Sequence, residues 1–185
     1  KPWLVADIPR GTLTCVVNGR TVPAGAAYLV YTSFVGGDNN IHSKIMFSRS
    51  DDCGGHWSQP SKLSESVARN QGTTIAVDPG TGAIYVAWRE FAVAGDQNSR
   101  NSIMVARSTD RGQSFTKAAP ITAGGYELAP FDQASSVLTF RTNAYPTLAV
   151  VPAEAEGRAA GQPGRLYLAW AARGFGGVRP SDARI

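Results

Sequence analysis

Residues that could do chemistry crowd into the tract 48–57, which holds two carboxylates, a cysteine, a histidine and a tryptophan around a pair of glycines. Neighbouring carboxylates such as Asp51 and Asp52 are typical of calcium-binding turns. A calcium loop of the EF-hand kind needs about twelve residues and a closing glutamate, and the tract has neither. His42 and His56 have no third ligand at the spacing of a metal site. We therefore expect no metal ion, and no other cofactor is indicated.

The tract is repeated downstream, which favours an architectural role over chemistry. The pattern Ser-x-Asp-x-Gly-x-x-aromatic occurs twice along the chain. Its residues are Ser50, Asp52, Gly54 and Trp57 in the first copy and Ser108, Asp110, Gly112 and Phe115 in the second. In such a turn an aspartate accepts hydrogen bonds from nearby backbone N–H groups, and a glycine can take a positive φ. The aromatic residue begins the next strand, where its ring can pack between adjacent sheets.

Short apolar runs bounded by turn residues surround both copies, and they predict an all-β chain of short strands. Two further segments also recur: residues 84–89 resemble 166–171, and residues 70–77 resemble 143–150. The opening residues 3–7 look like a degenerate copy of the second of these segments. The repeat unit is therefore strand A, strand B, strand C, the acidic turn and strand D.

The positions of these strands predict a β-propeller. In the first unit we expect strands at about 3–7, 26–34, 43–49 and 57–63. In the second we expect them at about 73–78, 83–89, 102–107 and 115–122, and in the third at about 146–151 and 165–171. Four-stranded units that repeat in this way are typical of propeller blades, whereas a β-sandwich has no reason to repeat a turn at blade spacing. We expect blade one at about 3–63, blade two at about 73–122 and a partial third blade at about 146–185, all within one domain.

Composition excludes two classes of partner. Basic residues exceed acidic ones by 18 to 14, but they are scattered singly, so nucleic-acid binding is not expected. No apolar stretch approaches the roughly 20 residues of a membrane-spanning helix. The chain opens with Lys1 and shows no signal-peptide pattern, so we expect either a removed leader or a piece of a longer protein.

The two acidic turns closely resemble the Asp box, Ser-x-Asp-x-Gly-x-Thr-Trp, of the bacterial neuraminidase repeat. His56 stands at the Thr position of the first copy and Ser114 at that of the second. The resemblance runs over nearly the whole chain and implies a sialidase-like β-propeller, a closed ring that commonly has six blades. About two and a half blades are visible here, so the remaining blades are expected from the rest of the protein. The Asp box does not specify activity, since sortilin-type receptors, xyloglucanases, photosystem assembly factors and non-catalytic secreted propellers carry it too.

In sialidases the chemistry lies on the face opposite the Asp boxes, where an arginine triad clamps the substrate carboxylate and an aspartate is the acid/base. The resemblance implies Asp38 and Asp96, in the two B–C loops, as alternative acid/base candidates. Arg89 and Arg141 are the candidates for the carboxylate clamp. The family's Arg-Ile-Pro is missing, Arg141 is displaced from its place, and the family's Tyr–Glu nucleophile pair cannot be assigned.

The strand order also bears on the two cysteines, which could form one bridge or remain two thiols. Cys15 lies in the first A–B insertion, residues 8–25, and Cys53 lies in the first C–D turn. Because A–B loops and C–D turns share one face of a blade, we favour a disulfide. A disulfide implies an oxidising compartment, so we expect a secreted or otherwise extracytoplasmic protein.

Two functions stay open. The first is a secreted sialidase-like glycoside hydrolase that acts on terminal anionic sugars. The second is a non-catalytic Asp-box propeller that binds glycans or protein partners, or serves as a structural module. Whether the chain is an enzyme is therefore left open by the sequence. Residues 123–144 form a long connection expected on the site face, and residues 152–164 form an insertion expected on the other face.

Overall fold

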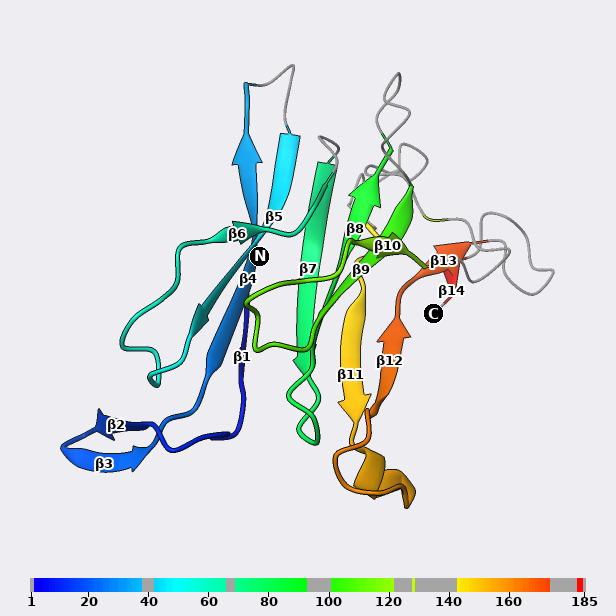
Figure 1. The fold of residues 1–185 in the computed structure, drawn as a ribbon. Helices are drawn as coiled ribbons and strands as arrows, with labels where there is room; N and C mark the ends of the chain where they lie inside the picture. The colour runs from blue at the N-terminus through cyan, green and yellow to red at the C-terminus, as the bar shows by residue number, and fades with distance from the viewer. Residues whose placement is uncertain are drawn as a thin grey trace.

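The computed structural model describes residues 2–37, 42–65, 69–92, 101–121, 128, 143–173 and 183–184. Over these residues the chain is all-β, with two four-stranded sheets and three strand pairs, all antiparallel (Figure 1). One short 3-10 helix, η1 (Ala153–Glu156), interrupts the strands. In this part of the chain no helix is long and apolar enough to cross a bilayer.

The first sheet is a meander that follows the order of the chain, β1-β4-β5-β6. Its strands are β1 (Trp3–Ala6), β4 (Ala27–Val35), β5 (His42–Ser50) and β6 (Ser61–Lys62). The two long strands pair over their whole length, from Ala27 opposite Ser50 to Val35 opposite His42. Burial alternates along them, so that Tyr28 and Val30 point into the core, as expected for a sheet with one covered face.

The second sheet repeats this meander as β7-β8-β9-β10. Its strands are β7 (Arg69–Val77), β8 (Ile84–Phe91), β9 (Ser102–Ser108) and β10 (Ala119–Pro120). Seven of the eight residues of β8 are buried, because this strand has neighbours on both sides and layers on both faces. A bulge between Gln71 and Thr74 shifts the register of β7.

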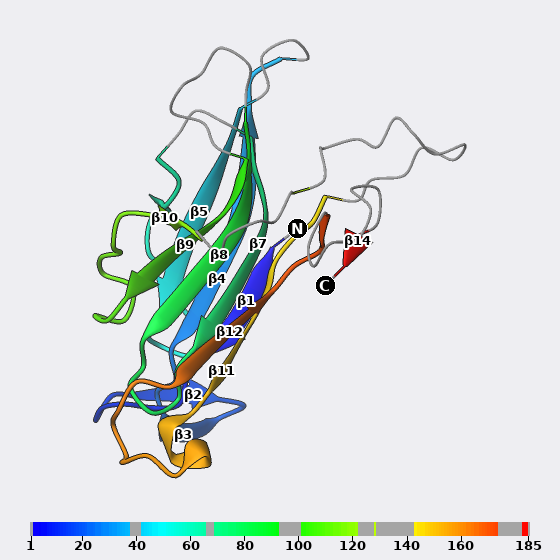
Figure 2. The same ribbon diagram turned by 90° about the vertical axis from the view of Figure 1, so that its right-hand side faces the viewer.

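Three strand pairs complete the described structure. They are β2 (Thr14–Val17) with β3 (Arg20–Pro23), β11 (Thr147–Val151) with β12 (Arg165–Ala169), and β13 (Ala172–Arg173) with β14 (Ala183–Arg184). Strand β7 contacts both β1 and β11, so the three copies of the repeated strand A lie next to one another (Figures 1 and 2).

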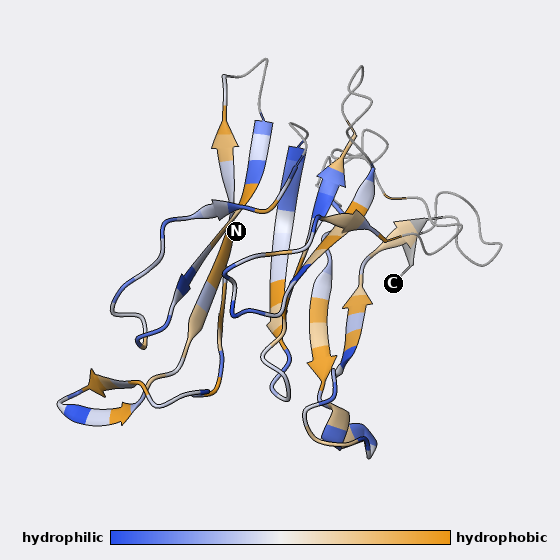
Figure 3. Ribbon diagram, viewed as in Figure 1, coloured by the Kyte–Doolittle hydropathy of each residue, from blue (hydrophilic) through white to orange (hydrophobic). Residues whose placement is uncertain are grey.

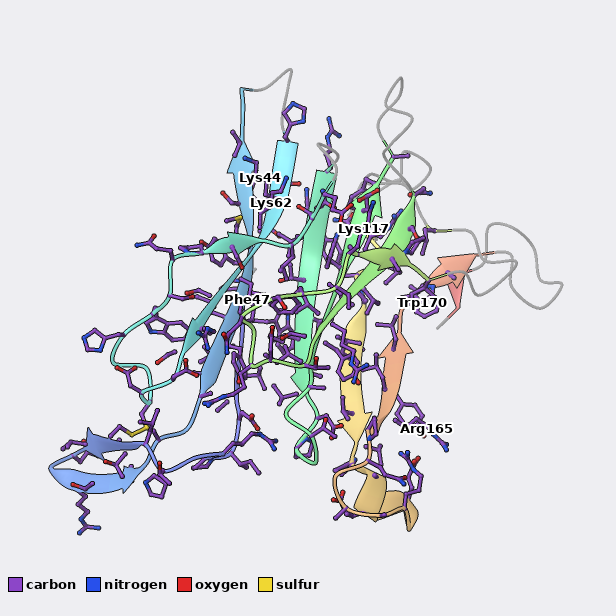
Figure 4. The ribbon with its side chains drawn as sticks, viewed as in Figure 1. Lys44, Phe47, Lys62, Lys117, Arg165 and Trp170 are labelled. Atoms are coloured by element: carbon purple, nitrogen blue, oxygen red, sulfur yellow. A yellow bond between two sulfur atoms is a disulfide. The ribbon has the colours of Figure 1, made fainter. Side chains whose placement is uncertain are left out.

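The main core lies between the two four-stranded sheets. Phe47 points into it from the first sheet (Figure 4), and Trp88 is fully buried on the second. A second cluster joins Ile103 of β9 to Leu168 of β12 and to Trp170, which directly follows β12. Because burial of one large apolar side chain stabilises a fold by about 1.5–3 kcal/mol, these two layers hold the three repeats together.

The all-β prediction is confirmed, and strands A, B and C of the first two units begin and end within four residues of their expected bounds. The D strands are shorter than expected. Only two residues of β6 pair with β5, and only two residues of β10 pair with β9. In the first unit Pro60, which has no N–H to donate, directly precedes the paired residues. The β2–β3 hairpin was not expected. Asn18 and Gly19 close it with positive φ at both turn positions, which favours such a tight hairpin.

Candidate ligand-binding site

The two acidic turns that resemble the Asp box, called Asp boxes below for short, have the same hydrogen-bond geometry. In the second, Asp110 accepts hydrogen bonds from the hydroxyl of Ser108 (2.8 Å) and the backbone N–H of Ser114 (3.0 Å). The N–H of Gly112, whose φ is +78°, donates to the Ser108 hydroxyl at 2.9 Å. Asp52 is bound in the same way, with His56 in place of Ser114. The expected roles of the aspartates and glycines are confirmed.

The two carboxylates of the first box face hydrogen-bond donors and cations. Both carboxylate oxygens of Asp52 accept hydrogen bonds within the turn. Asp51 lies 2.8 Å from a guanidinium nitrogen of Arg49 and 3.2 Å from one of Arg111. Since the Asp51 carboxylate already faces two cations, the turn does not present a calcium site. Among the described residues no three His, Cys, Asp or Glu side chains gather as metal ligands.

The Asp-box carboxylates predict a loss of stability in acid. Hydrogen bonds from His56 and Ser50 hold the pKa of Asp52 well below its usual range, and those from Ser114 and Ser108 do the same for Asp110. A carboxylate whose pKa is lowered by folding stabilises the fold above its unfolded pKa, and this contribution is lost as the pH falls below it. We expect the free energy of unfolding, measured in urea, to decline from about pH 5 downward. The variant Asp110→Asn should decline less steeply, and parallel profiles for the two proteins would contradict the assignment.

The aromatic residues of the two boxes differ in their surroundings. Phe115 packs edge-to-face on Phe47 of the first sheet, with ring centroids 4.8 Å apart, as expected. Trp57 is 41% exposed, so the expectation that it packs between sheets is wrong for this copy. The reason is that Phe115 has the preceding sheet to pack on, whereas no sheet precedes the first one among the described residues.

The predicted disulfide is confirmed: Cys15 of β2 is bonded to Cys53 of the first Asp box. The bond fastens the β2–β3 hairpin to the turn between β5 and β6. Both segments lie at the end of the sheets that carries the acidic turns, as the strand order predicted.

The predicted catalytic residues lie mostly outside the described part of the chain; these are Asp38, Asp96 and Arg141. Arg89 is described and is fully buried near the end of β8. Its guanidinium donates to the main-chain oxygens of Glu90 and Ser102 and to the side chain of Asn101, and it lies 4.4 Å from the ring centroid of Phe91. These contacts give Arg89 a place in the core of the sheet, and its role as a carboxylate clamp stays a prediction.

A cavity of about 540 Å³ opens between the repeated A strands, toward the end of the sheets opposite the Asp boxes; we call it the inner-strand cavity. This is also the end where polar residues gather on β5, β7 and β8 (Figure 3). Its lining comes from β1, β4, β7 and the segment that leads into β11. The lining residues are Trp3, Thr32, Phe34, Gln71, Gly72, Thr73, Asn143, Tyr145 and Pro146.

Tyr145 organises one wall of this cavity. Its hydroxyl accepts a hydrogen bond from the side-chain amide of Asn143 (2.7 Å) and donates one to Oε1 of Gln71 (2.9 Å). Its ring lies directly over Gly72, where a Cβ atom would come within 2.1 Å of ring carbon Cδ1. Gly72 has a φ of +66° at the β7 bulge, so glycine is required there both by the backbone and by the ring.

Three polar atoms of the lining are buried and have no hydrogen-bond partner among the described residues: Thr32 Oγ1, Thr73 Oγ1 and Asn143 Oδ1. Native proteins leave few such atoms unpaired, because each costs free energy comparable to a lost hydrogen bond. The three belong to different elements but to one cavity. All three atoms are closed to solvent, so they lie behind the cavity surface and not on it.

The lining residues were not identified as site residues from the sequence, and no charged side chain is among them. The arrangement can bind a ligand by ring contacts and neutral hydrogen bonds. Arg89, the one predicted catalytic residue that the structure describes, is not part of the lining.

No protein-family model matches the chain, and no curated protein matches it in sequence. The Asp-box resemblance therefore rests on the residues of the two turns and on the repeat.

Proposed function

We propose that the chain is part of a secreted, sialidase-like Asp-box β-propeller and that it binds a glycan in the inner-strand cavity. The observation that carries the proposal is the cavity, whose lining holds three half-exposed aromatic rings and the hydrogen-bonded side chains of Gln71, Tyr145 and Asn143. Saccharides are bound by the same two kinds of group, since a pocket needs apolar walls and a few placed polar atoms. The disulfide supports an extracytoplasmic location.

The arrangement of the sheets supports the propeller part of the proposal. Both four-stranded sheets are meanders in the order A to D, as in propeller blades. Strands β1, β7 and β11 are neighbours, which is the place of the innermost strands around a propeller axis. Each Asp box follows strand C of its sheet, so both turns occupy equivalent positions. The remaining blades would come from the rest of the protein.

Glycan binding is tested with the full-length protein on an array of oligosaccharides, followed by calorimetric titration of the strongest ligand. The proposal expects saturable binding that is weakened by Tyr145→Ala. Failure to retain any saccharide, with the protein folded by circular dichroism, would remove glycan binding from the proposal.

Hydrolysis of terminal anionic sugars is the second candidate function. It is favoured by the fact that β4 and β8 run to the end of the sheets where the cavity lies, and the B–C segments that carry Asp38 and Asp96 follow directly from them. We expect the full-length protein to release fluorophore from a fluorogenic sialoside if this function holds. No turnover would end the sialidase version and leave glycan binding untouched.

Substitution of each aspartate in turn shows which of the two, Asp38 or Asp96, is the general acid. Loss of a general acid lowers kcat by about 10²–10⁴, so either Asp38→Ala or Asp96→Ala is expected to show a decrease of that size. Asp51→Ala is the matched control, because Asp51 lies at the Asp-box end and pairs with Arg49 and Arg111. Unchanged kcat in both test variants would show that neither aspartate is the acid.

A further inference from the structure

We infer that the uncovered face of the first sheet is an interaction surface, and that a further four-stranded sheet of the same repeat packs on it. That sheet comes from the same polypeptide, outside residues 1–185. The surface is the face of β1, β4 and β5 that points away from the second sheet, and we call it the open face. This inference rests on the propeller part of the proposed function, and it is independent of glycan binding.

The two four-stranded sheets correspond residue by residue through the serines that open their acidic turns. Ala27 lies opposite Ser50 in the first sheet, and Ile84 lies opposite Ser108 in the second. Counted along the paired strands from these residues, four apolar side chains of the open face have apolar equivalents in the second sheet. Leu4, Leu29, Tyr31 and Met46 correspond to Ile75, Val86, Trp88 and Met104.

The second sheet buries these equivalents against the first sheet. All four are less than a tenth exposed, and they share the main core with Tyr28 and Phe47 of the first sheet. On the open face Leu4 is 61% exposed, and the other three side chains are only partly buried. Because side chains alternate along a strand, Leu29 and Met46 point away from the main core. No sheet covers them within the described structure.

Trp57 extends the open face toward the acidic turn. Phe115 holds the equivalent position in the second unit, and its ring packs on Phe47 of the preceding sheet with the centroids 4.8 Å apart. The two turns have the same hydrogen bonds, so we place Trp57 on the corresponding side of its own sheet. It is 41% exposed there. Large apolar side chains gathered on one face in this way are typical of a surface that a protein partner covers.

The packing of the two described sheets also indicates what fits the open face. Two unlike faces meet there: the first sheet contributes Phe47 and its neighbours, and the second contributes Trp88 and its neighbours. The open face is of the second kind, so its complement is a sheet that presents apolar side chains of the first kind. Pairing of two open faces from two copies would instead bring together like faces. It would also gather the exposed Lys44 and Lys62 of both copies (Figure 4), and such like-charge contacts are unfavourable.

Thiol labelling of the full-length protein measures whether the open face is covered. Met46→Cys is expected to react with a maleimide at least roughly 50-fold more slowly than Lys117→Cys, because a covered thiol reacts only when the structure opens. Lys117 is the control, since its side chain is 82% exposed. The two variants should react at the same rate in urea, and unsubstituted protein gives the background. A smaller difference in the native protein would show that the face is free and overturn the inference.

A matched pair of leucines gives a second measurement. Leu4 and Leu13 are 61% and 62% exposed, but only Leu4 lies on the open face. Leu4→Asp should lower the melting temperature of the full-length protein by at least roughly 5 °C, because a covering sheet would bury the carboxylate. Leu13→Asp should lower it by less than about 2 °C, as for an exposed position. Shifts of equal size overturn the inference, and if Leu4→Asp does not fold, the labelling rates decide.

Photo-crosslinking identifies what covers the open face. Benzoylphenylalanine in place of Trp57 is expected to cross-link within one polypeptide, to a peptide from outside residues 1–185, as mass spectrometry would show. A cross-linked dimer, or a cross-link to an unrelated protein, overturns the inference but leaves the propeller part of the proposed function standing. Free labelling of Met46→Cys with no cross-link removes the inference together with the closed ring. Glycan binding is untouched by either result, because the array measures it separately.

Discussion

Replacement of Gly112 with alanine is expected to lower the free energy of unfolding by about 2–5 kcal/mol. Gly112 has a φ of +78°, a conformation that costs an L-residue about 1–2 kcal/mol. A Cβ atom built on it would lie 2.5 Å from Cζ of the buried Phe47 ring, and such overpacking adds about 1–3 kcal/mol. Urea unfolding followed by tryptophan fluorescence measures the change.

Gly54 provides a matched control at the equivalent position of the other Asp box. Its φ is +88°, but no atom lies within 4 Å of a Cβ built there. Gly54→Ala should therefore cost only the backbone term, about 1–2 kcal/mol. Equal losses in the two variants would show that the contact of Gly112 with Phe47 does not matter. Those two glycines look alike in the sequence, and only the packing of the preceding sheet distinguishes them.

The repeated turn could be read from the sequence because its structure is determined by its own residues. Ser108, Asp110 and Gly112 contact one another within five positions of the chain. Because local hydrogen bonds and one residue with positive φ determine the turn conformation, residues far away in the chain have little effect on it. Strands A to C were found for a related reason, since they carry β-branched and aromatic runs bounded by turn residues. The exposure of Trp57 could not be predicted from the sequence, because it depends on whether another sheet packs beside the first one.

The inner-strand cavity was missed because its lining comes from segments far apart in the chain. A signal was nevertheless present in the alignment of residues 70–77 with 143–150. The two copies agree at Asn70 and Asn143 but differ at the next three positions, where Gly72 stands opposite Tyr145. These differing positions are the ones at which the bulge and the ring meet.

Arg89 illustrates a different limit of sequence reasoning. The family resemblance made Arg89 a candidate for the substrate clamp, since it ends the second B strand and precedes Asp96; the alternative was an exposed charge at the end of a strand. In the structure the guanidinium is covered and donates to the main chain of Glu90 and Ser102. Both acceptors are main-chain carbonyls, one on the next residue of β8 and one on the paired strand β9. A motif of side-chain types in the sequence cannot predict such main-chain partners.

Removal of the disulfide is expected to be the other large effect. The double variant Cys15→Ser with Cys53→Ser should lose about 2–4 kcal/mol of unfolding free energy, because the bond closes a long loop with a sequence separation of 38 residues in the unfolded chain. Thermal or urea unfolding measures this loss. Wild-type protein treated with reductant should fall to the same stability, and reductant should not change the variant.

The loss should be concentrated in the β2–β3 hairpin. A two-stranded hairpin is marginal by itself, and Leu13, Val16 and Val17 of this one are largely exposed, so the link to Cys53 supplies much of its anchorage. Amide hydrogen exchange should show residues 14–23 unprotected in the double variant, while β4 and β5 keep their protection because their burial in the core is unchanged. Two free thiols in the native protein by non-reducing mass spectrometry would contradict the bond itself. Retained protection in the variant hairpin would instead show that contacts along residues 7–26, such as the backbone bond from Asp7 to Ala26, suffice to hold it.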